Sequence, residues 1–122
     1  MWTFKAEGGL ACVKGERYVH YSPEELRQAI LDPVVQMKCD SILKETKPVA
    51  QLEMDTMVTY QKFKTPTVLV ADRDICAFHQ TVIDPKTNKM FLVAFSGEHP
   101  LCPPVKKVVR AQLHIGGFIL TP

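Results

Sequence analysis

Two cysteines and two histidines carry the side chains of this sequence that are best suited to binding a metal ion. They are Cys76, His79, His99 and Cys102. Cys76 and His79 lie three positions apart in a predicted strand, so their side chains point to opposite faces. His99 and Cys102 can approach each other in a loop, but a structural zinc site needs four ligands. We therefore predict no metal site and expect the cysteines to be free thiols that pack as small hydrophobic side chains.

Enzymatic chemistry has little support in the sequence. It contains no Gly-x-Ser-x-Gly elbow, no Walker-type phosphate loop and no His-Glu-x-x-His motif. Ser96 and His99 are close in the sequence, but no third group is placed to orient a triad. A general-base role for His79 is the remaining enzymatic alternative, and it requires a perturbed pKa inside a pocket. We predict that the protein is not an enzyme and needs no cofactor.

Two polar side chains interrupt apolar strand faces and point to a different chemistry. Alternation over residues 56–64 places Gln61 on the more apolar face, together with Met57, Thr59 and Phe63. The opposite face, predicted to be the wetter one, carries Val58, Tyr60, Lys62 and Lys64. Over residues 74–83, His79 shares a face with Ile75, Ala77, Thr81 and Ile83. A buried polar group without a partner costs about 1–3 kcal/mol, so a bound head group, water or a neighbouring strand must meet Gln61 and His79.

One helix is predicted directly after residue 21. Ser22 is suited to the N-cap, Pro23 to the first helical position and Glu25 to completing a capping box. Pro33 ends this helix, and a second short helical turn is plausible over residues 34–38.

Strands outnumber helices in the rest of the pattern. We predict strands over residues 14–21, 42–53, 56–64, 74–83 and 89–96. Residues 107–120 form either one long strand or two that meet at Gly116 and Gly117, where a bulge or a close backbone approach is expected. The residues at 84–88 are typical of a hairpin loop. Short loops between successive strands favour an antiparallel meander in an α+β fold.

Length and composition are those of one ordinary globular domain. The 122 residues are 46% hydrophobic and 23% charged, with a net charge of +2. This charge is too small to indicate nucleic-acid binding, and no apolar run is long enough to span a membrane. The first seven residues lack the apolar core of a signal peptide, so we expect a cytoplasmic protein.

Several short motifs together resemble one known family. They are Pro66, Arg73-Asp74-Ile75, His99-Pro100-Leu101-Cys102-Pro103-Pro104, Val109-Arg110-Ala111 and Gly116-Gly117-Phe118-Ile119. In this order they resemble the START (StAR-related lipid transfer) family. The resemblance implies a helix-grip fold, in which a curved antiparallel sheet encloses a cavity that holds one lipid noncovalently. We expect Arg73, Asp74 and Arg110 to fix the strands by ion pairing rather than to touch the lipid.

The resemblance also implies which residues meet the ligand. Sterol-binding members of the family place an acid and an arginine at the positions of Gln61 and His79, and this neutral pair cannot form their salt bridge. In the ceramide-transferring member, the position of Gln61 is also a glutamine and an acidic contact matches Asp40, whereas a further polar contact falls at Ala94. We therefore predict ligand-binding roles for the residues Gln61, His79, Asp40, Met57, Phe63, Ala77 and Ala94, for a sterol, a phospholipid or a sphingolipid.

Two structures are predicted for the apolar residues in the segment 64–72. Family members carry an omega-shaped loop at the cavity mouth here, which implies that Val68, Leu69 and Val70 make a transient membrane contact. Lys62 and Lys64 would support it, since each lysine near an anionic surface contributes about 1 kcal/mol. The alternative is that the apolar triplet begins the next strand and packs inward.

Compared with the family, the chain is expected to be a partial domain, 1–122, truncated at both ends and without the C-terminal lid helix. A sheet that is apolar on both faces would then expose a hydrophobic patch. Missing flanking segments or a second copy of the chain would cover it. This leaves, as the alternative function, a protein-interaction or regulatory module or a lipid sensor that dimerises through the exposed apolar face of the sheet. A helix-grip hydrolase or cyclase is a weaker alternative.

Overall fold

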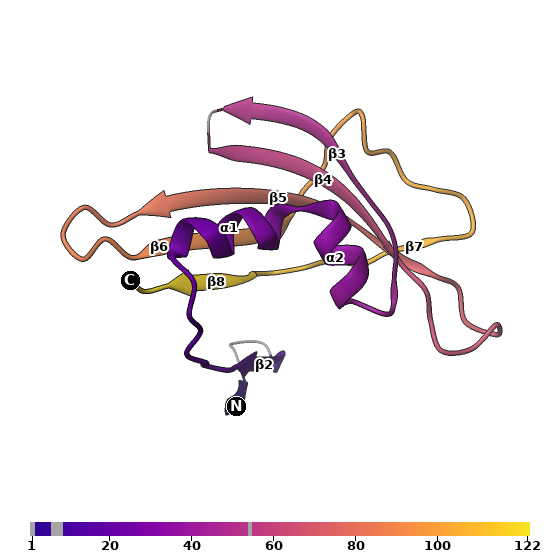
Figure 1. Cartoon of the computed structure of the whole chain (residues 1–122). Helices are drawn as coiled ribbons and strands as arrows, with labels where there is room; N and C mark the ends of the chain where they lie inside the picture. Colours follow the sequence, from indigo (N-terminus) through magenta and orange to yellow (C-terminus); the bar gives the residue numbers. More distant parts are fainter. Residues whose placement is uncertain (1, 6–8, 54) are drawn as a thin grey trace.

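A computed structural model describes residues 2–5, 9–53 and 55–122. The chain forms two helices and eight strands in this part. Their bounds are β1 Trp2–Lys5, β2 Ala11–Lys14, α1 Pro23–Leu31, α2 Pro33–Cys39, β3 Leu43–Glu53, β4 Thr56–Phe63, β5 Arg73–Ile83, β6 Met90–Ser96, β7 Val109–Arg110 and β8 Gly116–Leu120. The predicted α+β class, with a short helical segment ahead of a curved antiparallel sheet, is confirmed (Figure 1).

The main sheet has the strand order β3-β4-β5-β6-β8, and each neighbouring pair is antiparallel. The hairpin between β5 and β6 turns at Asp84, whose carboxylate accepts hydrogen bonds from the Lys86 amide and the Thr87 hydroxyl. Asn88 adopts a φ of 58°, a left-handed conformation that asparagine tolerates. The predicted hairpin at residues 84–88 is therefore present, and it sets the register of the two central strands.

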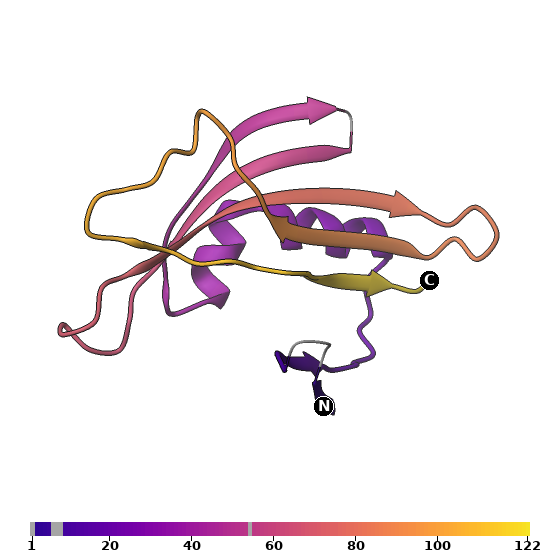
Figure 2. The same cartoon turned by 180° about the vertical axis from the view of Figure 1, so that it is seen from behind.

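Both helices lie across one face of the sheet, as the views from the front and from behind show (Figures 1 and 2). The predicted capping box at the start of α1 is present: the Ser22 hydroxyl accepts from the Glu25 amide, and the Glu25 carboxylate accepts from the Ser22 amide. Asp32 ends α1 and caps α2 by accepting from the Val34 amide at 2.8 Å. Because Pro33 follows this residue directly, the chain turns sharply between the helices.

One hydrophobic cluster packs on each face of the sheet. On the helix side, Leu26 and Ile30 of α1 pack against Met90, Leu92 and Leu120 of β6 and β8. On the opposite side, the cluster consists of Val58, Tyr60, Cys76 and Cys102, flanked by Val49, Ala50 and Phe78.

The second cluster corrects one prediction. Val58 is 0% and Tyr60 7% exposed, so the face of β4 predicted to be the wetter one is buried along this part of the strand. The reason is long-range: the proline-rich segment after β6 returns over the sheet and places Cys102 against both side chains.

Two strand predictions were wrong. Residues 15–20 form no strand, and Tyr18 is fully exposed, because the alternating pattern there finds no neighbouring strand to pair with. Residues 107–120 form neither one strand nor two that meet at the glycines. Instead β7 pairs with the start of β5 in parallel, and β8 pairs with β6 after an irregular segment.

Gly117 explains the close approach of β8 to β6. Its φ is 140°, and a Cβ atom placed on it would lie 1.8 Å from the carbonyl oxygen of Leu92. Only glycine fits at this contact.

Candidate functional site

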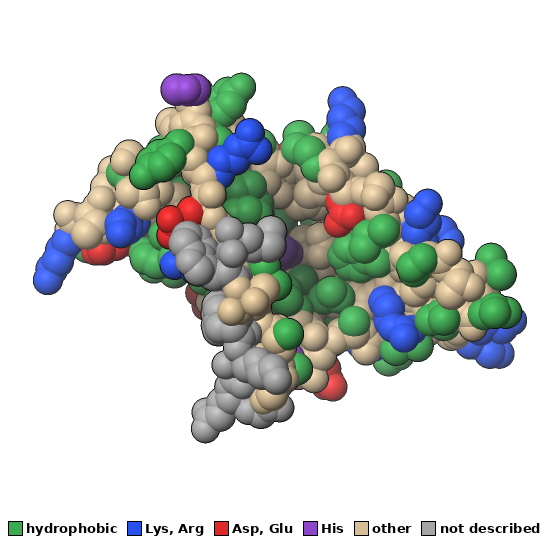
Figure 3. All heavy atoms as spheres, turned by 90° about the horizontal axis from the view of Figure 1, so that it is seen from below, with side chains coloured by type: hydrophobic (Ala, Val, Ile, Leu, Met, Phe, Trp, Pro, Cys, Tyr) green, Lys and Arg blue, Asp and Glu red, His purple; other side chains and the backbone are tan. Residues whose placement is uncertain are grey.

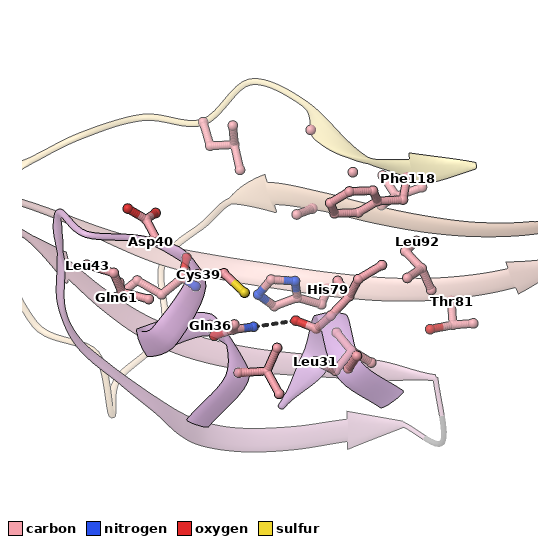
Figure 4. Close-up of a pocket in the computed structure, with 18 of the residues that line it drawn as sticks. Leu31, Gln36, Cys39, Asp40, Leu43, Gln61, His79, Thr81, Leu92 and Phe118 are labelled. Atoms are coloured by element: carbon pink, nitrogen blue, oxygen red, sulfur yellow. Dashed lines mark hydrogen bonds between the residues drawn. The ribbon is translucent and has the colours of Figure 1, made fainter. Parts of the chain in front are cut away.

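A cavity of about 540 Å³ lies between the two helices and the strands β3, β4, β5, β6 and β8 (Figure 4). Its walls are largely apolar and include Ile30, Leu31, Val35, Leu43, Leu92 and Phe118. This volume is in the range of small-molecule sites, which are about 300–1,000 Å³. Phe118, which lines the cavity, is 53% exposed, so this part of the wall also faces solvent. Seen from below, the molecule is hollowed, with hydrophobic side chains around the hollow (Figure 3).

His79 lies near the middle of the cavity (Figure 4). Its Nε2 is 2.8 Å from the hydroxyl oxygen of Thr59, and its Nδ1 has no hydrogen-bond partner among the described residues. Burial lowers the pKa of His79 below its usual value, so the ring is neutral near pH 7. The ring also lines a second cavity of about 110 Å³, together with Met57 and Thr59.

Gln61 and Asp40 lie toward one end of the cavity (Figure 4). Within the described part of the chain, no hydrogen bond engages the Gln61 amide. Asp40 is the C-cap of α2, and its Oδ1 accepts from the Ile42 amide at 3.1 Å. Leu92, Thr81 and Phe118 lie toward the other end. The cavity therefore has a polar end and a mostly apolar end.

The other predicted ligand-binding residues are distributed unevenly. Phe63 and Ala94 line the large cavity, and Ala94 is the β6 partner of His79 in the sheet register. Met57 lines only the smaller cavity. Ala77 is 1% exposed and lines neither cavity.

Gln36 is a polar cavity residue that the sequence analysis missed. Its amide nitrogen donates to the Ile30 carbonyl at 2.7 Å, and its amide oxygen accepts from the Thr46 hydroxyl. These bonds join α2 to α1 and to β3, so Gln36 fixes the helices over the sheet. The only signal for it in the sequence was its position within the short helical turn predicted over residues 34–38.

The predicted ion pair between Asp74 and Arg110 lies outside the cavity. Asp74 pairs with Arg110, and the Tyr60 hydroxyl donates to the same carboxylate at 2.9 Å. Arg110 also donates to the carbonyl oxygens of Cys102 and Pro103, which holds the proline-rich segment, including Pro104, against the sheet. Arg73 instead donates to the carbonyl oxygen of Ala71.

Cys76 and Cys102 are buried together on the side of the sheet that faces away from the helices. Burial, followed by a hydrogen bond with Cys102, raises the pKa of Cys76 to about 12. The thiol is therefore protonated and unreactive at neutral pH. Among the described residues, no group of three or more histidine, cysteine or acidic side chains is placed to hold a metal ion.

The segment between β4 and β5 forms a projecting loop (Figure 1). Val68 is 102% and Leu69 91% exposed, and Val70 is partly exposed. The three residues therefore do not begin β5 and do not pack inward. They also do not line the cavity. None of the helices in the described residues is long and apolar enough to cross a bilayer.

Comparisons with known proteins agree with this architecture. The START domain family model matches residues 9–122. Human STARD10 superposes with a TM-score of 0.71 at 26% identity, over 80% of this chain and 39% of that chain. Human StAR-related lipid transfer protein 5 superposes with a TM-score of 0.72 at 21% sequence identity, over 85% of this chain and 50% of that chain. The lipid transfer and protein localization domain of human StarD13 (DLC2) superposes with a TM-score of 0.69 at 19% sequence identity, over 85% of this chain and 51% of that chain.

The predicted helix-grip fold is confirmed by these superpositions. The chain spans only about 39–51% of the length of the three solved chains. A sequence search of curated proteins gives no significant match.

Proposed function

Since this chain belongs to the START domain family, we propose that it binds one lipid molecule noncovalently in the cavity between its helices and its sheet. The proposal covers a sterol, a phospholipid or a sphingolipid, and it extends to transfer of that lipid between membranes. It involves no covalent step and no cofactor.

The cavity is the observation that carries the proposal. Its apolar walls would bury the hydrocarbon part of a lipid, which contributes roughly 25 cal/mol per Å² before the costs of binding. Leu92 and Phe118 would contact this part. Gln61, Asp40 and His79 would orient the polar end, because the Gln61 amide and the His79 Nδ1 have no other partner among the described residues.

The projecting loop suits a transient contact with a membrane surface. Val68 and Leu69 are fully or almost fully exposed, and Lys62 and Lys64 precede them on the chain. Insertion of the two apolar side chains among lipid head groups, with the lysines near anionic lipids, would bring the cavity to the membrane.

A cavity-filling variant tests the proposal. Ala94→Phe places a ring in the space next to His79, whereas Ala11→Phe makes the same change on an exposed strand. We expect Ala94→Phe to reduce the lipid bound after incubation with vesicles by at least tenfold and to leave the circular-dichroism spectrum unchanged. Ala11→Phe should bind as the wild type does. Equal binding by all three proteins, or an empty wild type, would contradict the proposal.

A second candidate function rests on the exposed edge strand β8. Phe118 is 53% and Ile119 60% exposed, and β8 ends the strand order of the sheet. Unpaired edges with apolar side chains are sites of strand pairing between molecules. A second copy of the chain pairing here predicts a dimer whose population rises with concentration in sedimentation experiments. A monomer at all concentrations would exclude this function.

A further inference from the structure

We propose that the cavity selects an uncharged lipid whose polar end carries a hydroxyl or amide group, and that it excludes lipids with a phosphate or carboxylate head group. This inference rests on the proposed function and narrows it to one chemical class. It depends on the charges and the free hydrogen-bonding groups around the cavity.

The charges around the cavity are unsuited to an anion. Among the described residues that line it, none is a lysine or an arginine, and the only carboxylate is that of Asp40. The guanidinium of Arg27 donates to the hydroxyl of the cavity residue Thr81 at 3.4 Å, but it is already paired with the Glu24 carboxylate at 3.2 Å.

The smaller cavity supplies no free cation either. Lys47 is among its lining residues, but its ammonium group pairs with Glu45 and lies over the Tyr60 ring. Tyr60 belongs to the cluster on the opposite face of the sheet, so this charge is directed away from the cavity.

The helix end at the cavity has the same electrostatic sign as Asp40. Cys39 and Asp40 at the C-terminal end of α2 line the cavity, and the last carbonyl groups of a helix carry partial negative charge. A phosphate would lose its hydration shell there and meet two negative groups, with no compensating cation among the described lining residues. Burying an unpaired charge in this way is strongly unfavourable.

The unengaged polar groups favour a hydrogen-bond donor. The Oδ2 of Asp40 is a free acceptor among the described residues, and the Gln61 amide offers one acceptor and two donors. His79 is neutral, because burial lowers its pKa, so it adds one donor or acceptor and no charge. Gln36 is already satisfied by Ile30 and Thr46. A hydroxyl or amide N–H can be met here, whereas an anion finds too few donors.

Two lipids that differ only at the head group test this selectivity. Dioleoylglycerol ends in a hydroxyl, and dioleoylphosphatidic acid carries a phosphate on the same acyl chains. We expect the wild-type protein to extract dioleoylglycerol from vesicles with at least tenfold higher affinity. Equal extraction, or a preference for phosphatidic acid, would overturn the selectivity and leave the proposed function intact.

If neither lipid binds, native mass spectrometry of the protein purified from cells decides the matter. An empty cavity contradicts the proposed function, a bound lipid with a charged head group contradicts only the selectivity, and a bound uncharged lipid supports both.

A charge-introducing variant extends the test. Gln61→Lys places an ammonium group at the polar end of the cavity, and Gln112→Lys makes the same change on the exposed surface. We expect Gln61→Lys to raise the affinity for dioleoylphosphatidic acid relative to dioleoylglycerol by at least about tenfold, since a hydrogen bond to a charged group contributes that much. An unchanged ratio in a folded Gln61→Lys protein would count against the proposal, and the wild-type comparison stands if this variant does not fold.

Discussion

The carboxylate of Asp74, whose side chain is 1% exposed, lies 2.7 Å from the guanidinium Nε of Arg110. The same guanidinium holds the carbonyl oxygens of Cys102 and Pro103. One ion pair therefore joins β5, β7 and the proline-rich segment. The side-chain hydrogen bonds with Asp74 also raise the pKa of Arg110, so the guanidinium stays charged.

Removal of this ion pair should destabilise the protein. Arg110→Met leaves the buried Asp74 carboxylate without its cation, and we expect the free energy of unfolding in urea to fall by about 3 kcal/mol. Arg73→Met is the matched control, because the Arg73 side chain donates only to the Ala71 carbonyl among the described residues, and it should change stability by about 0.5 kcal/mol or less. Equal losses from the two variants would show that Arg110 has no special structural role.

The neutral state of His79 predicts a dependence of stability on pH. Its pKa is lowered in the folded protein, so between that value and about 6.5 the unfolded chain binds more protons than the folded one. The free energy of unfolding should be constant with respect to this group above pH 7 and should fall as the pH drops below about 6.5. His79→Gln should reduce this slope, and His114→Gln, at an exposed position, should not. A slope unaffected by His79→Gln would contradict the assignment.

Gln61 should affect ligand choice more than folding. Gln61→Leu removes the free amide from the polar end of the cavity, and we expect the affinity for a hydroxyl-bearing lipid to fall by about 3- to 12-fold, the equivalent of one neutral hydrogen bond. Urea unfolding should change little, because no described residue bonds to this amide. Gln112→Leu serves as the control on the surface. A matching loss of stability and of all lipid binding would assign Gln61 a structural role.

The cysteines should differ sharply in reactivity. Cys39 is exposed, whereas Cys76 and Cys102 are buried and burial raises the pKa of Cys76 to about 12. Alkylation of the native protein followed by peptide mass spectrometry should label Cys39 first and leave Cys76 and Cys102 unlabelled until denaturant is added. Rapid labelling of Cys76 in the native state would show that the cluster around it opens.

The projecting loop should control membrane contact and not cavity affinity. Replacing Val68 and Leu69 by serine should lower co-sedimentation with anionic vesicles by several-fold and slow lipid transfer, while binding of a lipid presented in detergent is retained. The same double change at Leu10 and Val13 removes two exposed apolar side chains elsewhere. Similar effects of both double variants would indicate nonspecific adsorption.

Local signals in the sequence predicted the local structure well. The start of α1 depends on Ser22 and Glu25, which are three residues apart, and the turn between β5 and β6 depends on Asp84 and its neighbours. In each case the interacting groups belong to one short segment, so the pattern contains the information that determines the structure.

Features that depend on distant partners were not predictable in this way. The burial of Val58 and Tyr60 depends on Cys102, which lies more than forty residues further along the chain. The parallel pairing of β7 depends on the bond between Arg110 and Asp74. Gln36 was missed for the same reason, since its role requires Thr46 on another element.

The predicted ligand-binding residues also include some that strand alternation places correctly and one that it does not. Strand alternation placed Gln61 and His79 on one face, and both line the cavity. The same alternation included Ala77, which is buried but does not line the cavity. The spacing of residues along a strand does not show where the covering helices lie, so this difference was not predictable.

The cluster of Val58, Tyr60, Cys76 and Cys102 has no residue in common with either cavity wall. The release of a ligand from the cavity would therefore remove no contact of these four cluster residues with the ligand. We expect the cluster to remain packed in the ligand-free protein. In the proposed transfer of lipid, this cluster would therefore stay packed between the release of one lipid and the uptake of the next.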